Sequence, residues 1–600
     1  MCGSNQGGPR LSRNGVGGLS GLWAVLGGAA LIGAVAGQAV HGQTVAGRAA
    51  AGQAGAARGV GGQATAGQGA AGQGAAGQAA AGQAAAGRGM AGQAVPAAPQ
   101  VRVDSGLLAG ASANGVESFK GIPFAAPPTG PLRWRAPQPV QPWHGVREAT
   151  QVGWDCVQTP FPGNAAPLGA SLREDCLYLN VWRPAGSRPD SKLPVMVWIH
   201  GGGFVNGGAS PPVFSGESFA RKSVIMVSIN YRLGRFGFFA FPALTRENED
   251  HGLLGNYGYM DQLAALHWVE RNIAAFGGDP HNVTVFGESA GGESVNVLLT
   301  SPLAKGLFER AIMQSGGGRK SLMGGRRLSD DQPGLPSLES VGVAFAKKHG
   351  IEGTGSEALS RLRALPAEAL DDGLNMATMG KQSDTYGGPS IDGTIVVTSP
   401  EESYRAGRQA HVPVIIGATS ADIGFLKANT KDAAFATFGS HAAAARAAYD
   451  PDGSRELRVI TAAIAADRTM VEPARFVAST LARQGIPTYE YRFSYVADSM
   501  ASEWKTGAPH ATDVPYVMNT VATKYGERLT PKDAAIADQI NSYWANFAKT
   551  GNPNGPGLPP WPSYDPAEDQ IMDFAANGHP AAIADPWKVR LDLVVTSLQR

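Results

Sequence analysis

Short apolar runs alternate with helical patterns along the last 500 residues of this chain, and this alternation restricts the available folds most strongly. The apolar runs span residues 193–199, 224–230, 283–286 and 412–417. Continuous apolar runs are typical of central strands that are buried on both faces. Residues 261–275 repeat apolar side chains at helical spacing, and Gly277-Gly278 ends that pattern. The chain is therefore predicted to be an α/β protein with a mostly parallel central sheet covered by helices on both faces.

Two of the predicted strands end in glycine-rich turns, which is where open α/β sheets bind their ligands. The first turn reads HGGGF (residues 200–204), and the second reads GESAG (residues 287–291). The second matches G-x-S-x-G, in which a strained turn between a strand and a helix exposes a serine nucleophile, here Ser289. Either motif alone also occurs as a plain structural turn. Together, with a strand before GESAG and a helical pattern after it, they predict a serine hydrolase site.

A serine hydroxyl is a weak nucleophile at neutral pH, so the site needs a base, which is usually His. In α/β-hydrolases the acid and then the His follow the Ser along the chain. The His residues after Ser289 are His349, His411, His441, His510 and His579. His510 lies in the loop sequence GAPHATD, and a fixed loop is the usual place for a catalytic base.

The acid that orients this imidazole should follow a strand between Ser289 and His510. Asp422 fits, because it comes five residues after Gly417 at the end of a predicted strand. An Asp in this position is just as typical of a turn. The spacing alone leaves both interpretations open.

The first 100 residues differ sharply from the rest. They contain no Asp, Glu or Lys, five Arg, and 27 of the 81 Gly residues. An early pair of Arg, an apolar stretch at 19–36 and small residues at its end are typical of a secretory signal peptide, which we place at residues 1–36. The alternatives are an uncleaved N-terminal anchor and a start of translation further along the chain.

A pentapeptide repeat follows the apolar stretch. Gln or Arg recurs at every fifth position from Gln38 to Gln93, twelve times in register. A period of five matches neither helix nor strand, and Ala, Gly and Gln bury too little surface to offset the entropy of ordering. We interpret residues 37–97 as a disordered spacer and residues 98–600 as the globular domain.

The order of these motifs resembles the type-B carboxylesterase family, which includes bacterial para-nitrobenzyl esterases. FGG at 276–278, then four residues and VTVFGESAG, is similar to the serine signature of the family. EDCLYLNVW at 174–182 is similar to its second signature. The blocks GIPFA (121–125), NYR (230–232) and QSG (314–316) are further resemblances. The similarity spans about residues 101–600 and implies an α/β-hydrolase fold.

The resemblance also implies roles for particular residues. Ser289 would be the nucleophile, His510 the base and Asp422 the acid, although most members have Glu followed by Gly where this chain has Asp422 and Ile423. The backbone amides of Gly202, Gly203 and Ala290 would form the oxyanion hole, and Ser315 would be an accessory hydrogen-bonding residue. Cys156 and Cys176 would form the first disulfide of the family, a pairing also plausible for an exported protein.

These observations predict an exported, secreted or periplasmic, serine carboxylesterase acting on small-molecule carboxylic esters. The alternatives are a catalytically silent adhesion or binding protein of the same fold, and a lipase or amidase.

No cofactor is implied, and no compact metal-ligand motif is present. A net charge of +1 argues against a nucleic-acid binder, and 43% hydrophobic residues suit a packed core better than a polytopic membrane protein. We expect membrane contact only if the N-terminal segment stays uncleaved. Choline esters are disfavoured, because the Cys156–Cys176 loop contains neither Trp nor Tyr. The natural ester and the oligomeric state stay open.

Overall fold

The computed structural model describes residues 98–161, 166–321 and 325–598. The predicted signal peptide (1–36) and repeat spacer (37–97) lie outside these residues. No helix within the described ranges is both long and apolar enough to cross a membrane.

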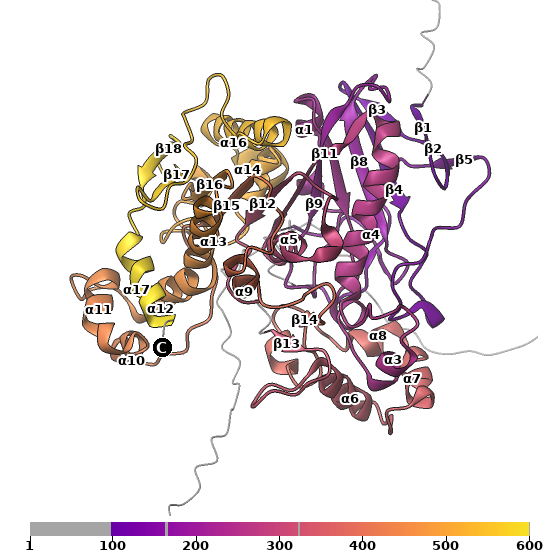
Figure 1. The fold of residues 1–600 in the computed structure, drawn as a ribbon. Helices are drawn as coiled ribbons and strands as arrows, with labels where there is room; N and C mark the ends of the chain where they lie inside the picture. Colours follow the sequence, from indigo (N-terminus) through magenta and orange to yellow (C-terminus); the bar gives the residue numbers. More distant parts are fainter. Residues whose placement is uncertain (1–97, 162–165, 322–324, 599–600) are drawn as a thin grey trace, which may run out of the picture. The chain divides into compact units, whose positions relative to one another are not determined.

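A large mixed sheet organises the described residues (Figure 1). In spatial order its strands are β18 (Ala581–Ala584), β17 (Gln570–Phe574), β16 (Thr488–Phe493), β15 (Val414–Thr419), β12 (Arg310–Gln314), β11 (Gly278–Glu288), β9 (Leu193–Ile199), β10 (Ile225–Ile229), β8 (Tyr178–Pro184), β4 (Val116–Pro123) and β3 (Ala111–Ala113). All neighbours from β17 to β10 pair in parallel, and the pairings at both edges are antiparallel. The predicted mostly parallel sheet is confirmed, and each of the four apolar runs contributes a strand to it.

The sheet is buried on both faces, as its apolar strands require. Along β9, Val195, Val197 and Ile199 enter one hydrophobic cluster, while the alternating Met196 and Trp198 enter another. Helices α4 (Tyr257–Asn272), α5 (Ala290–Thr300) and α13 (Glu472–Arg483) pack in the first cluster. Helices α1 (Glu217–Arg221) and α16 (Pro531–Thr550) pack in the second. A strand whose successive side chains point to opposite faces therefore supplies both cores.

The helix predicted over 261–275 is α4, which starts four residues earlier and continues as the 3₁₀ turn η3 (Ile273–Phe276). Gly277 ends it with φ 89°, a left-handed conformation that glycine adopts at low cost. The apolar run at 412–417 predicts a strand, and β15 begins at Val414, two residues into that run and after Pro413, which has no N–H to donate.

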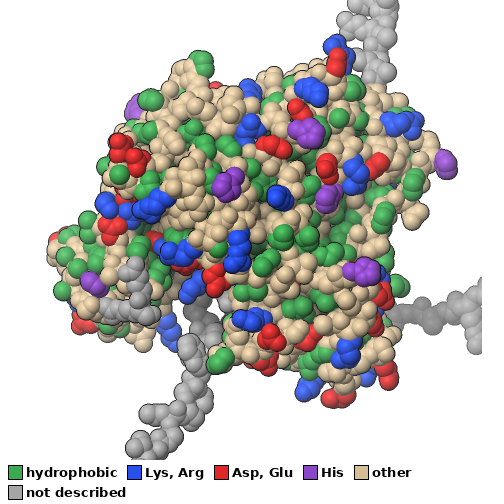
Figure 2. Space-filling model, in the orientation of Figure 1, with side chains coloured by type: hydrophobic (Ala, Val, Ile, Leu, Met, Phe, Trp, Pro, Cys, Tyr) green, Lys and Arg blue, Asp and Glu red, His purple; other side chains and the backbone are tan. Residues whose placement is uncertain are grey.

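Helices α10 (Lys431–Ala436), α11 (Ala442–Tyr449), α12 (Leu457–Ala466) and α17 (Lys588–Leu598) form a separate group with its own small apolar core (Figure 1, lower left). On the face shown in Figure 2, basic and acidic side chains are interspersed. The near-neutral balance of the sequence is thus spread over that face rather than divided into blocks of one sign.

Candidate active site

Ser289 occupies a sharp turn between β11 and α5. Its φ of 57° and ψ of −122° lie outside the ordinary helical and extended regions, so the turn is strained at this residue. Two glycines permit it. A Cβ added at Gly287 would lie 2.5 Å from the Gly291 carbonyl, and one at Gly291 would lie 2.0 Å from the Ile199 carbonyl oxygen. The GESAG motif therefore has the strand–turn–helix context that the sequence predicted.

A continuous hydrogen-bonded chain links Ser289, His510 and Asp422. His510 Nε2 lies 2.8 Å from Ser289 Oγ, and His510 Nδ1 lies 2.6 Å from Asp422 Oδ1. Ser289 and Asp422 are buried, while 13% of the His510 side chain is exposed. The structure thus brings together three residues separated by up to 221 positions in the sequence. The arrangement can pass a proton from a serine hydroxyl to an imidazole that a carboxylate orients.

Asp422 is held by donors on both carboxylate oxygens. Oδ2 accepts hydrogen bonds from Ser315 Oγ (2.6 Å) and the Thr419 amide (3.0 Å), and Oδ1 accepts one from the Ile423 amide (2.8 Å). Burial alone would raise the pKa of Asp422, but the His510 charge and these hydrogen bonds lower it below its usual value. Asp422 therefore stays ionised next to His510, and the predicted accessory residue Ser315 touches the acid.

The glycine turn (residues 200–206) lies directly beside Ser289. A Cβ added at Gly201 would lie 3.0 Å from Ser289 Cβ. Neither the Gly202 amide nor the Gly203 amide donates a hydrogen bond to another described residue. Ala290 is the first residue of α5, and first-turn amides have no acceptor within their helix. The three amides predicted for the oxyanion hole are therefore available to a ligand oxygen.

His200 starts this turn and is fully buried. Burial lowers the pKa of His200 to about 4, so its ring is neutral, and Nδ1 faces the Gly201 carbonyl oxygen at 2.8 Å. The ring stacks on Tyr231 with centroids 4.4 Å apart, and the Tyr231 hydroxyl donates to the His200 carbonyl at 2.9 Å. These contacts hold the glycine turn against the end of β10.

Two further buried acids, Glu288 and Asp513, raise the pKa of His510, and neither of them was assigned a role at the site from the sequence. Glu288 Oε1 lies 3.1 Å from His510 Nε2, and burial raises the pKa of Glu288. Asp513 accepts hydrogen bonds from Gln314 Nε2 (2.8 Å) and Tyr491 Oη (3.1 Å), and burial raises its pKa also. Burial acts to lower the pKa of His510, but Glu288 and Asp422 outweigh it, so the pKa is raised. The only signal in the sequence is the position of Glu288 inside GESAG and of Asp513 three residues after His510.

The other candidate histidines lie elsewhere. His349 ends α6 (Leu338–Lys348), and His411 precedes β15. His441 and His579 lie in the 3₁₀ turn η6 (Gly439–His441) and in the connection between β17 and β18. Within the described part of the chain, no three His, Cys, Asp or Glu side chains gather in a group that could hold a metal ion.

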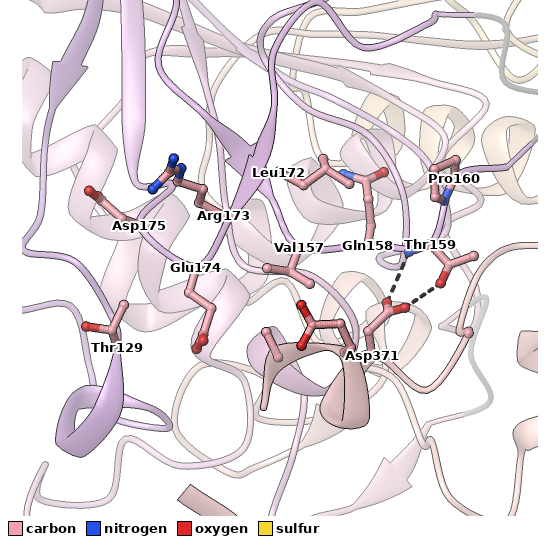
Figure 3. Close-up of a pocket in the computed structure, with 13 residues that line it drawn as sticks. Thr129, Val157, Gln158, Thr159, Pro160, Leu172, Arg173, Glu174, Asp175 and Asp371 are labelled. Atoms are coloured by element: carbon pink, nitrogen blue, oxygen red, sulfur yellow. Dashed lines mark hydrogen bonds between the residues drawn. The ribbon is translucent and has the colours of Figure 1, made fainter. Parts of the chain in front are cut away.

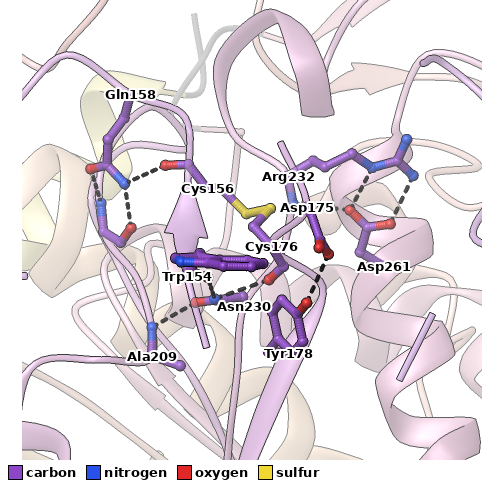
Figure 4. Close-up of a disulfide and its surroundings, with 11 residues drawn as sticks. Trp154, Cys156, Gln158, Asp175, Cys176, Tyr178, Ala209, Asn230, Arg232 and Asp261 are labelled. Atoms are coloured by element: carbon purple, nitrogen blue, oxygen red, sulfur yellow. Dashed lines mark hydrogen bonds and ion pairs between the residues drawn. A yellow bond between two sulfur atoms is a disulfide. The ribbon is translucent and has the colours of Figure 1, made fainter. Parts of the chain in front are cut away.

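Cys156 and Cys176 are joined by a disulfide (Figure 4). Asn230 lies next to it, and its Nδ2 donates to the carbonyls of Trp154 (2.9 Å) and Cys176 (3.0 Å). A cavity of about 690 Å³ borders α8 (Ala367–Asp371) and two described parts of the disulfide loop, residues 157–160 and 172–175, as Figure 3 shows. Ser289, His510 and Asp422 do not line it. The cavity is therefore distinct from the hydrogen-bonded chain at Ser289.

Comparisons with known proteins show which family the chain belongs to. The model of the carboxylesterase family matches residues 97–587. Mouse (Mus musculus) carboxylesterase 1F is 34% identical over 503 residues, which cover 76% of this chain and 85% of that protein. Fumonisin B1 esterase of Sphingopyxis macrogoltabida is 32% identical over 510 residues, covering 80% of this chain and 89% of that protein. A solved PNB esterase superposes with a TM-score of 0.68 at 31% identity, covering 82% of this chain and 99% of that structure. This chain belongs to the carboxylesterase family, with the α/β-hydrolase fold, and is a carboxylic ester hydrolase.

Proposed function

We propose that the chain hydrolyses small-molecule carboxylic esters through an acyl-enzyme on Ser289. His510 is the general base and acid, Asp422 orients and stabilises its imidazolium, and the amides of Gly202, Gly203 and Ala290 form the oxyanion hole. Ser315 assists through its hydrogen bond to Asp422. The observation that carries this proposal is the unbroken Ser289–His510–Asp422 chain beside unpaired backbone amides.

The chemistry follows from the geometry. His510 Nε2 accepts the Ser289 hydroxyl proton while Oγ attacks the ester carbonyl carbon. The carbonyl oxygen becomes an oxyanion that the free amides stabilise, each donor typically contributing about 3 kcal/mol. When the C–O bond breaks, the imidazolium protonates the leaving alkoxide. A water, deprotonated by His510, then attacks the acyl-enzyme and releases the carboxylic acid and Ser289.

The cellular location and the N-terminal segments belong to the proposal as well. Export is supported by the disulfide, because disulfides persist in oxidising compartments, and by the signal-like pattern of residues 1–36. Residues 37–97 would then link the exported domain (98–600) to its new N-terminus as a spacer. Mass spectrometry of protein recovered from the periplasm or medium would test this. We expect a mature chain that starts near residue 37, and intact residues 1–36 in a membrane fraction would support an anchor instead.

The activity is tested with the full chain and a short-chain para-nitrophenyl ester. Ser289→Ala and His510→Ala should both fall to background while their thermal unfolding stays cooperative. A para-nitrophenyl amide and a long-chain emulsified ester, run in parallel, distinguish an esterase from an amidase or a lipase. Folded wild-type protein that neither turns over ester nor reacts with an organophosphate would refute the proposal.

A further inference from the structure

The glycine turn is closed by hydrogen bonds between its own backbone groups. A contact that fixes its last residue, Asn206, therefore also restrains the glycines before it. The Gly202 carbonyl accepts hydrogen bonds from the amides of Val205 (3.1 Å) and Asn206 (2.9 Å). A Cβ added at Gly202 would lie only 2.1 Å from the Asn206 carbonyl oxygen. These contacts orient the Gly202–Gly203 peptide, which carries the Gly203 amide, and place the Gly202 Cα directly against Asn206.

The Asn206 side chain ties this turn to two other segments. It is buried, with 2% exposed. Its Nδ2 donates to the Thr159 carbonyl (2.8 Å) and to Gln158 Oε1 (3.3 Å), and its Oδ1 accepts from the Met376 amide (3.0 Å). Every polar atom of the carboxamide is thus used, and all three partners lie outside the turn.

Gln158 and Thr159, which accept hydrogen bonds from Asn206, are themselves held by further hydrogen bonds. Gln158 Nε2 donates to the carbonyls of Cys156 (3.0 Å) and Gly207 (2.7 Å), which connects the turn to the disulfide (Figure 4). Asp371 at the end of α8 accepts hydrogen bonds from the amide and hydroxyl of Thr159 (Figure 3). Residues 156–159, which begin at the disulfide, are therefore hydrogen-bonded to each other and to α8, and Asn206 attaches the glycine turn to these residues and to Met376.

We propose that Asn206 is a positioning residue for ester hydrolysis, which holds the Gly202 and Gly203 amides in register with Ser289. The inference rests on the proposed role of these amides in the oxyanion hole. An oxyanion hole works because its donors are already in place when charge develops. A displacement of about 1 Å in such groups costs up to about 100-fold in rate. Without the carboxamide, the Met376 amide and the Thr159 carbonyl also lose their partner, which loosens both supports of the turn.

The test compares Asn206→Ala and Asn206→Asp with wild type and with Asn541→Ala. Asn541 is the control, because it is also buried and its carboxamide also donates and accepts, to the Val517 carbonyl (2.8 Å) and from Ser218 (3.0 Å), but it lies on α16. The Asp variant keeps an acceptor for Met376 and loses the donor to Thr159. The readouts are kcat and KM for the para-nitrophenyl ester, Tm, and the affinity for a trifluoromethyl ketone, whose tetrahedral adduct places an oxyanion in the hole.

We expect Asn206→Ala to lower kcat about 10- to 100-fold with KM changed less than about threefold. Affinity for the ketone should fall by the same factor, and Asn206→Asp should lose at least as much, because its carboxylate would face the Thr159 carbonyl and Gln158 Oε1, which are both acceptors. Asn541→Ala should lower Tm but leave kcat and ketone affinity within about twofold.

The proposal is overturned if folded Asn206 variants keep wild-type kcat and ketone affinity, or if Asn541→Ala loses as much activity at a similar Tm. Asn206→Asp decides the matter if the Ala variant does not fold. Ser289→Ala, run in the same assay, separates the two proposals: full activity in that variant would refute the proposed nucleophile rather than the role of Asn206.

Discussion

The replacement Asp422→Asn tests the choice of triad acid most directly, because three carboxylates lie near His510. In the wild type, Asp422 Oδ1 lies 2.6 Å from His510 Nδ1, so Nδ1 carries the proton and Nε2 is left to accept one from Ser289. The carboxamide of an Asn offers one acceptor atom where the carboxylate offers two. The backbone amides of Thr419 and Ile423 donate to opposite oxygens, so each orientation of the Asn sets its NH₂ against one of them.

Either orientation of the carboxamide in the Asp422→Asn variant makes His510 a poorer general base. With NH₂ toward His510, Nδ1 becomes an acceptor, the proton moves to Nε2, and Ser289 can no longer be deprotonated. With the oxygen toward His510, the tautomer is correct but the negative charge that stabilises the imidazolium is gone. We therefore expect kcat to fall about 1,000- to 10,000-fold, which corresponds to about 4–5.5 kcal/mol in the activation free energy.

The assay is para-nitrophenolate release by the full chain, with Tm measured to confirm folding. Asp513→Asn is the matched control, because the Asn oxygen can still accept from Gln314 and Tyr491, and we expect it to cost less than about tenfold. If Asp422→Asn keeps kcat within tenfold while Asp513→Asn or Glu288→Gln loses about 1,000-fold, the acid has been assigned to the wrong residue.

Three further predictions follow from neighbouring features. Glu288→Gln removes a carboxylate that raises the pKa of His510, so the low-pH limb of the kcat/KM profile should move to lower pH by about one unit. Gly291→Ala should prevent folding or cost at least about 3 kcal/mol, because its methyl group would overlap a backbone carbonyl of β9 that cannot move independently. The double replacement Cys156→Ser with Cys176→Ser should lower the free energy of unfolding by about 3 kcal/mol, because the bond closes a loop with a sequence separation of 20.

The pH profile is compared with that of Asp513→Asn, which should shift in the same direction but less, because the charge of Asp513 raises the pKa of His510 less than that of Glu288 does. A limb that stays in place or moves upward in Glu288→Gln contradicts the electrostatic argument. Gly380→Ala adds a methyl group where no atom lies within 4 Å and should be nearly neutral, so equal costs at the two glycines would refute the steric reasoning. Wild type unfolded in a thiol reductant should match the double Ser variant, and an unchanged Tm in both would mean that the disulfide contributes nothing to stability.

Much of the fold was predictable because its signals are local. The continuous apolar runs predicted β9, β10, β11 and β15, since a strand buried on both faces needs apolar side chains at successive positions. The GESAG turn was predictable for the same reason, because its glycines are required by contacts with adjacent backbone. Where strand and helix ends differ, as at Pro413 and at the start of α4, the difference amounts to a few residues.

The site itself was predictable only in part. Ser289 and His510 could be selected from motif and loop context, and the structure places them 2.8 Å apart. Asp422 remained open from spacing alone, because a turn-forming Asp has the same local pattern as a triad acid. Its distance of 2.6 Å to His510 Nδ1 supports the second interpretation, while its role in catalysis stays a prediction until Asp422→Asn is measured.

Local residue patterns account for the order of the elements, the strained serine turn and the glycine turn, since each depends on residues within a few positions of one another. The side chains around that serine, in contrast, come together only when the sheet and its helices pack. Glu288 reaches His510 from the end of β11, Asp513 acts on the pKa of His510 from the loop before α14 (Val514–Val517), and Asn206 finds its partners 47 and 170 residues away. The physical reason is that a hydrogen bond depends on distance in space, and the packing of a sheet between two helical layers brings together residues that no local pattern connects.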